Sequence, residues 1–238
     1  MTNQEFLTNF YLQWDKVATA SNLGYTPEEI SLIATEAQEL LVLNSYQEIS
    51  NSAKEGFEET EKRTQELGEL VTTATISPEA VDSTNLTNGR YFILPNSLEN
   101  DPTDYSNVHW LTIYEEAITN DPCHTNKSII AKSHDEVNRL QDDPFTQPKG
   151  LYTWRVRVNG RKHELITDGS YTITSYKIRY IRKPKPIDLT GTATNPVSEL
   201  SDLVHRRLLR LTVQLASNQA EEYDKYKINI ETNNGYRE

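Results

Sequence analysis

The sequence is poor in cysteine, in glycine and in long apolar stretches, and each scarcity excludes a class of protein. A single cysteine, Cys123, excludes an intramolecular disulfide and any metal site built from several cysteines. Nine glycines in 238 residues leave little material for a glycine-rich phosphate-binding loop. No stretch approaches the roughly 18 apolar residues that cross a membrane, and the first residues show no signal-peptide pattern. We therefore expect no membrane partner.

Catalytic motifs are also missing. The sequence contains no Gly-x-Ser-x-Gly elbow, no Walker A loop, no Gly-x-Gly-x-x-Gly and no His-Glu-x-x-His, and its five histidines lack the i, i+4 spacing of a helical metal site. We predict that the chain is not an enzyme, with no catalytic, metal-binding or cofactor-binding residues and no cofactor. A hydrolase would instead need a cleft that joins His134 or His163 to a carboxylate within hydrogen-bond distance.

The charge is acidic overall and unevenly distributed. The 24 basic and 35 acidic side chains give a formal net charge of -11. Counted along the sequence, residues 1–148 hold 8 basic and 25 acidic side chains, residues 149–186 hold 10 and 2, and residues 187–238 hold 6 and 8. The acidic excess argues against phosphate neutralisation over the whole surface. An acidic and a basic surface on one chain favour contact between identical subunits, which can close into a ring.

Helical periodicity marks both ends of the chain. Phe6, Phe10, Trp14 and Val17 form one apolar stripe, and a further helical pattern covers 52–71. Thr26 with Glu29, and Ser133 with Glu136, have the spacing of capping boxes at the starts of two other helices. A leucine-rich stripe from 200 to 215 predicts a last helix. We expect residues 1–75 to be the N-terminal part of a helical bundle that residues 191–220 complete.

The region 76–190 changes to the two-residue period of β-strands. Short apolar runs at 91–94, 108–113 and 128–131 predict strands. Asn159-Gly160 lies between two further strands and predicts a hairpin with a type I′ turn. The apolar parity changes between Ile173 and Tyr176, which predicts a bulge near Thr174. We expect an antiparallel β-rich domain inserted into the helical bundle, and therefore an α+β fold.

The last segment, 221–238, is polar and has no periodicity. We predict an extended tail that becomes ordered when it docks on a partner.

Basic residues alternate with aromatic residues on the strands between 152 and 185, and three interpretations are open. The basic residues could contact a subunit or another partner, they could bind single-stranded nucleic acid, or they could form a solvated face. The predicted contact residues are Arg155, Arg157, Arg179, Arg182, Lys183, His205, Arg206, Arg210, Tyr223, Tyr226 and Tyr236.

Five stretches, in order, resemble one family of proteins. They are Thr26–Ile30 with Ala37–Leu41; Gly56–Arg63 with Leu67 and Leu70; His134–Leu140 with Asp143–Phe145 and Pro148; Tyr171–Tyr176 with Ile178–Ile187; and Glu199–Arg206. Together they resemble virion structural proteins of crAss-like, short-tailed bacteriophages, most of all the head-to-tail connector or ring proteins between portal and tail. The resemblance spans most of 5–216.

The resemblance implies a structural function without catalysis. It implies a dodecameric ring in the neck of the virion, assembled in the host cytoplasm, that connects the portal to the tail and extends the DNA channel. The implied partners are other copies of the chain, the portal, adjacent ring or tail proteins, and genomic DNA that passes through the lumen without specific binding. Two alternatives stay open: another collar or tail-hub ring of the same virion, and a nucleic-acid-binding β-domain protein.

Overall fold

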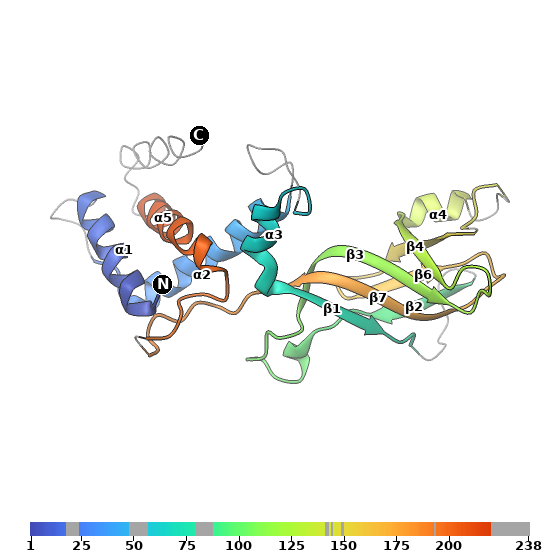
Figure 1. Cartoon of the computed structure of the whole chain (residues 1–238), viewed down its shortest axis with the longest axis horizontal. Helices are drawn as coiled ribbons and strands as arrows, with labels where there is room; N and C mark the ends of the chain where they lie inside the picture. Colours follow the sequence, from blue (N-terminus) through green and yellow to red (C-terminus); the bar gives the residue numbers. More distant parts are fainter. Residues whose placement is uncertain are drawn as a thin grey trace. The chain divides into compact units, whose positions relative to one another are not determined.

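The computed structural model describes residues 1–17, 24–47, 57–79, 88–140, 143, 145–148, 150–192 and 194–219. The chain divides into two compact units, which Figure 1 shows. The helical unit comprises residues 1–70 and 184–238, and the β unit comprises residues 71–183. Helices and a seven-stranded sheet are both present, so the predicted α+β class is confirmed.

The helical unit begins with the two helices whose starts the sequence marks most clearly. In α1 (Asn3–Val17) the predicted apolar stripe is buried at Phe6, Phe10 and Trp14. In α2 (Pro27–Tyr46) the predicted capping box is present: the Thr26 hydroxyl accepts from the Glu29 amide, and the Glu29 carboxylate accepts from the Thr26 amide at 2.8 Å. These reciprocal bonds satisfy two backbone donors that the first helical turn would otherwise leave unpaired.

A polar stripe on α2 holds the backbone of a segment that lies far away in the sequence. The hydroxyls of Ser31 and Thr35 accept hydrogen bonds from the amides of Leu189 and Ile187, both at 3.0 Å. The Gln38 side chain, which is fully buried, donates to the Lys185 carbonyl at 2.8 Å. Buried backbone groups need partners, and here side chains of α2 supply them. Residues 185–189 thus run along the helix.

The third helix is shorter than predicted. A helical pattern over 52–71 was expected, but α3 covers Glu61–Leu67 and is followed by a short 3-10 helix, η1 (Gly68–Leu70). Val71 already belongs to a strand. The sequence from Val71 to Ile76 is rich in β-branched residues, which favour strands, and pairing with another strand overrides the helical pattern at its end. Residues 52–56 of that prediction lie outside the described residues.

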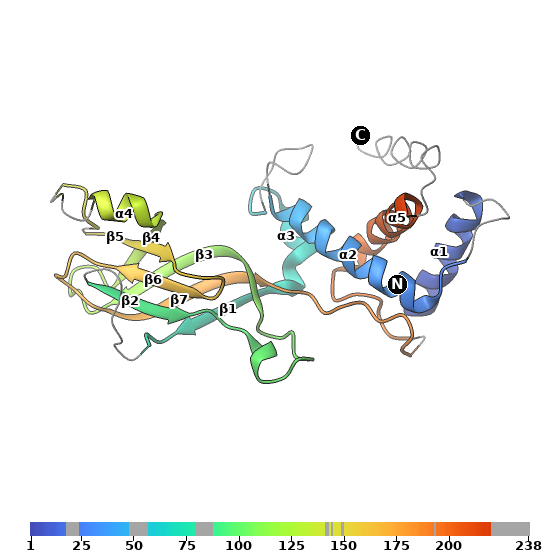
Figure 2. The ribbon, with the colours of Figure 1, turned by 180° about the vertical axis from the view of Figure 1, so that it is seen from behind.

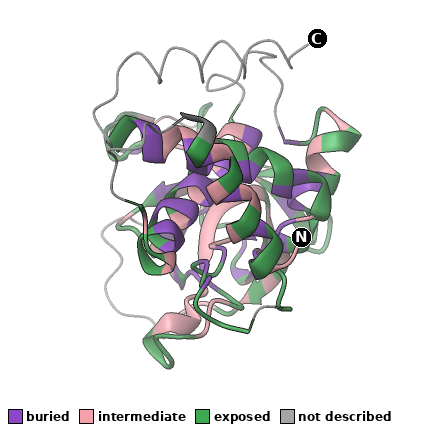
Figure 3. Cartoon of the chain, turned by 90° about the vertical axis from the view of Figure 1, so that its left-hand side faces the viewer, coloured by how far each residue is buried: buried purple, intermediate pink, exposed green. Residues whose placement is uncertain are grey.

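The last helix, α5 (Asp202–Gln219), presents a different face to the core than the leucine spacing suggested. Val204 and Leu208 are buried as expected, but Leu203 is 67% exposed. The buried face includes Leu209, Val213 and, among polar residues, Thr212, whose hydroxyl bonds to the carbonyl one turn earlier. A buried hydroxyl that has a hydrogen-bond partner is compatible with an otherwise apolar buried face. Figure 3 shows buried and exposed residues on opposite faces of the helices.

The β unit is one curled, mixed sheet. In chain order its strands are β1 (Val71–Ile76), β2 (Gly89–Ile93), β3 (His109–Thr119), β4 (Asn126–Ala131), β5 (Tyr152–Arg157), β6 (Lys162–Ile166) and β7 (Ile173–Arg182), with a 3-10 helix η2 (Ser97–Glu99). Their order across the sheet is β1-β7-β3-β4-β5-β6-β2 (Figure 2). The Glu79 amide, just after β1, bonds to the Tyr91 carbonyl in β2 at 2.9 Å. The chain at the two edges of the sheet therefore meets at this point.

The prediction of a purely antiparallel sheet is wrong at one pairing. β4 and β5 are parallel, with Ser128 opposite Tyr152 and Ile130 opposite Trp154. Between them lies the helix α4 (His134–Leu140), which begins with the predicted capping box of Ser133 and Glu136. A crossover through a helix returns the chain in its original direction, so the strands on either side pair in parallel. The strand–helix–strand order in the sequence already contained this signal.

Two local predictions for the sheet have different outcomes. The bulge is confirmed: Ile118 lies opposite Ser175 and Thr119 opposite Ile173, so Thr174 is the extra residue. The hairpin between β5 and β6 is present, but its turn is not type I′, because neither Asn159 nor Gly160 has a positive φ. Instead the Asn159 side chain accepts from the Arg161 amide at 2.9 Å, which closes the turn by a side-chain bond.

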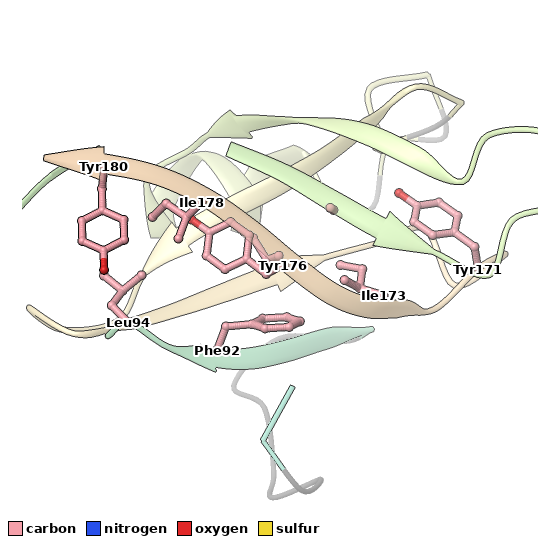
Figure 4. Packing of buried hydrophobic residues seen from close by; sticks show 9 residues of the cluster. Phe92, Leu94, Tyr171, Ile173, Tyr176, Ile178 and Tyr180 are labelled. Atoms are coloured by element: carbon pink, nitrogen blue, oxygen red, sulfur yellow. The ribbon is translucent and has the colours of Figure 1, made fainter. Parts of the chain in front are cut away.

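The sheet has a different core on each side. The concave side buries aromatic and aliphatic residues from both edges and the centre of the sheet, with Phe92 against Tyr176 at a ring-centroid distance of 5.6 Å (Figure 4). The convex side is covered locally by α4, whose Val137 packs with Trp154, Val156 and Ile166. This second core decides which way the side chains of β5 point.

Candidate interaction surfaces

The predicted contact residue Arg155 points into the concave side of the sheet. It lies opposite Leu165, a member of the concave core, whereas Trp154 and Val156 face α4. Its guanidinium forms an ion pair with Glu115 at 3.2 Å, and the two side chains are only 19% and 12% exposed. Arg155 is therefore part of a largely buried charge pair in its own chain.

His163 and Tyr176 extend this pair into a hydrogen-bonded network with one consistent proton arrangement. The Tyr176 hydroxyl donates to the Glu115 carboxylate, so its oxygen is left to accept at 3.1 Å from His163 Nδ1. Nδ1 must then carry the imidazole proton, which leaves Nε2 as an acceptor facing Arg155 at 3.5 Å. The network thus holds its carboxylate between an arginine and a tyrosine.

Burial shifts the acid–base equilibria of the network. It lowers the pKa of His163 to about 3, with the Arg155 charge adding to the effect. Burial likewise lowers the pKa of the neighbouring His109 to about 4, helped by the charges of Arg157 and Arg155. Burial raises the pKa of Glu115, against the opposing effects of Tyr176 and Arg155. His163 is therefore neutral near pH 7, and its 3.8 Å approach to Glu115 is not an ion pair.

Arg157 is exposed, but its guanidinium is used by the adjacent turn. It donates to the carbonyls of Asn159 and Gly160 at 3.3 and 3.4 Å. Arg157 thus stabilises the β5–β6 turn while its charge stays at the surface.

Arg179 lies on the convex side of β7 and is exposed, as the contact prediction requires. Its neighbours across the sheet are Thr73 in β1 and Tyr114 in β3, both exposed, and Lys177 follows two residues earlier on the same side. Arg182 and Lys183, at the end of the strand, are half-buried. The exposed basic residues of β7 therefore form a polar strip with a tyrosine beside it.

In the helical unit the predicted contact residues separate into one buried and two exposed side chains. His205 is 3% exposed; its ring bonds to the Leu200 carbonyl at 3.0 Å and lies 2.9 Å from Asp202. Arg206 and Arg210 are exposed on the outer side of α5. His205 therefore offers little surface to a partner in this chain, whereas the two arginines are accessible.

The remaining predicted contact residues, Tyr223, Tyr226 and Tyr236, and the tail 221–238 lie outside the described residues. Contact with a partner stays a prediction for all of these positions.

Sequence reasoning missed several exposed apolar side chains. Phe145, in the segment after α4, is 96% exposed, and Leu32 in the middle of α2 is 75% exposed. Phe145 was assigned to a family motif, and Leu32 was passed over as one apolar residue among many. Only the helical phase of Leu32, which lies on the side of α2 opposite the buried residues, could have singled it out.

Within the described residues, no three His, Cys, Asp or Glu side chains are placed to hold a metal ion. In the same part of the chain, no helix is long and apolar enough to cross a membrane.

Comparison with known proteins identifies the class to which this fold belongs. Residues 1–227 match the family model described as phage tail ring protein 3/4, so the chain belongs to that family. Among its relatives is Ring protein 4/5 of Bacteroides phage crAss001, 28% identical over 233 residues that cover 91% of this chain and 92% of that protein. Ring protein 3 of the same phage is 28% identical over 231 residues, covering 91% and 95%. The predicted resemblance to crAss-like virion ring proteins is confirmed.

Proposed function

We propose that this chain is a building block of a homo-oligomeric, dodecameric ring in the neck of the virion, where it connects the portal to the tail and extends the DNA channel. The observation that carries the proposal is the match to ring proteins over nearly the whole chain. In this arrangement the helices form a bundle that closes the ring, with the β-rich domain inserted into it. The role is structural and needs no chemistry at an active site.

The distribution of charge supports a passage for DNA rather than a binding site for it. The excess of 17 acidic charges in residues 1–148, from 25 acidic and 8 basic side chains, would repel the phosphate backbone if it lines the lumen. Phosphate groups that are repelled cannot anchor the genome while it moves. Residues 221–238 would serve as a docking arm on the portal or on an adjacent ring.

A nucleic-acid-binding β domain is less well supported by the side chains. Of the three arginines that would carry it, Arg155 is in a buried ion pair and Arg157 caps its own turn. Strand binding needs a continuous row of accessible cations with stacking aromatics. Arg179 with Tyr114 provides a much shorter one.

The test is to determine the mass of the purified full chain, alone and with purified portal, together with a low-resolution map of the virion neck. The proposal expects a closed ring in the neck density with multiple copies of the chain. A chain that stays monomeric even with portal present would refute it. Solved coordinates of the ring that place the acidic residues on its outside would refute the lumen assignment.

A further inference from the structure

The outer side of α2 combines acidic and exposed apolar side chains. Glu28, Leu32, Glu36 and Leu40 follow one another at intervals of four residues, and all are exposed, Leu32 by 75% and Leu40 by 36%. The residues at this spacing lie on one side of a helix, opposite the buried stripe that contains Ile30, Ala34 and Leu41. The helix has no basic residue. We call Glu28, Leu32, Glu36 and Leu40 together the acidic face of α2.

The outer side of α5 has the complementary composition. Leu203 is 67% exposed, and Arg206, Arg207 and Arg210 are exposed on the same side, three to seven residues further on. One of them, Arg207, is 3.6 Å from Glu66 of its own chain. No hydrogen bond or ion pair involves Arg206 among the described residues. The basic face of α5 is therefore Leu203 with these three arginines.

The two faces cannot satisfy each other within one chain. In α2 and in α5, the residues that face the core of the helical unit are on the opposite side of the helix from the exposed residues. Exposed leucines flanked by charges of one sign are typical of protein-interaction sites, and arginine is enriched at such contacts. Each face is therefore suited to a partner that carries the other.

We propose that the acidic face of α2 in one copy packs on the basic face of α5 in the next copy. The occupant of each face is thus a second copy of this chain, chosen because the charges are complementary and both faces belong to every copy. Such a contact joins two different surfaces, so each copy leaves one of each free and the contact repeats until it closes on itself. The leucines supply the apolar centre and the charges fix the orientation.

This inference rests on the proposed ring and specifies the contact that builds it. Charge reversal tests it directly, in the full chain. Glu36→Arg alone, or Arg206→Glu alone, places like charges opposite each other at every contact. We expect each variant to associate at least about tenfold more weakly than the natural chain, because like charges that face each other across an interface repel. Native mass spectrometry measures the species present.

Mixing the two variants is the decisive experiment, because it tests whether the two charge reversals compensate each other. In an equal mixture, the α2 face with Glu36→Arg meets the α5 face with Arg206→Glu, and the unchanged faces of the two chains also match. The mixture should therefore recover the assembled mass in strictly alternating order. Glu58→Arg, which reverses another exposed charge in the helical unit, is the matched control and should assemble like the natural chain.

A second measurement keeps the test independent of folding defects. With Cys123→Ser in both chains, a chain carrying Leu32→Cys is mixed with one carrying Leu203→Cys and oxidised. The expected product is a disulfide-linked pair that contains one chain of each kind. Absence of that pair, or normal assembly by Glu36→Arg, overturns the contact while leaving the ring in place. A natural chain that stays monomeric with portal present overturns the ring itself.

Discussion

The strands β5 and β7 carry the same alternation of basic and apolar residues, yet they use it in opposite ways. In β7 the apolar residues Tyr176, Ile178 and Tyr180 face the concave core and Arg179 faces solvent. In β5 Arg155 faces the concave side and Trp154 faces α4. Alternation therefore shows that a strand has two faces, but only the second layer that packs on the sheet decides which of them is buried.

The comparison predicts a large difference in stability between two arginine substitutions. Arg155→Met leaves the largely buried Glu115 without its cation, and we expect a loss near the lower end of the about 3–5 kcal/mol that breaking a fully buried pair costs. Arg179→Met removes an exposed side chain and should change the free energy of unfolding by less than about 0.5 kcal/mol. Urea unfolding followed by tryptophan fluorescence measures both. Equal stability of the two variants would break the comparison.

The histidines in and beside the hydrogen-bonded network around Glu115 should also make the fold sensitive to acid. Burial in the folded chain lowers the pKa of His109 to about 4 and that of His163 to about 3, from the ordinary histidine pKa of 6.5. Both histidines therefore bind protons less readily in the folded state than in the unfolded state. The unfolded state therefore binds more protons, and stability is lost as the pH falls below about 6.5. The raised pKa of Glu115 acts in the opposite direction. His109 and His163 are neighbours, so we count one proton for the two together. The free energy of unfolding should then fall by about 3 kcal/mol between pH 6.5 and pH 4.

Thermal unfolding between pH 7 and pH 4 checks this expectation. A chain with both His109→Asn and His163→Asn should show a flatter pH profile over the same range, whatever its stability at pH 7. An unchanged slope would assign the acid sensitivity to other groups.

A smaller effect is expected at the other end of the concave side. Lys127 is 1% exposed, forms an ion pair with Asp121 at 2.7 Å and lies 4.0 Å from the centre of the Tyr171 ring. Lys127→Met leaves the partly exposed Asp121 and the Gly150 carbonyl without their donor, a loss of about 2 kcal/mol. Lys177→Met, on the exposed side of β7, is the control and should leave urea unfolding unchanged. Equal losses would show that the two sides of the sheet are energetically alike.

Local structure in this chain could be predicted where the residues themselves determine it. The capping boxes at Thr26 and Ser133 and the bulge at Thr174 need only a few neighbouring residues, and all three were predicted. The prediction of a type I′ turn at Asn159 was wrong, because a side-chain hydrogen bond closes the turn in place of the backbone geometry that Asn-Gly prefers.

Features that depend on distant residues could not be obtained in this way. The burial of Arg155 depends on Glu115, which is forty positions earlier in the chain. The phase of α5 depends on which side of the helix meets α1 and α2, and an evenly leucine-rich sequence does not specify that side. The arginine contact residues were therefore chosen by charge, and charge does not distinguish the paired Arg155 from the exposed Arg206.

The hydrogen bonds from α2 to residues 185–189 have a consequence for biosynthesis. The helical unit is built from two parts of the chain with the whole β unit between them. During translation, residues 1–70 leave the ribosome long before the backbone that Ser31, Thr35 and Gln38 bind. The sheet, whose residues are contiguous, can close first, and the helical unit can complete its packing only after residues 184–219 have been synthesised.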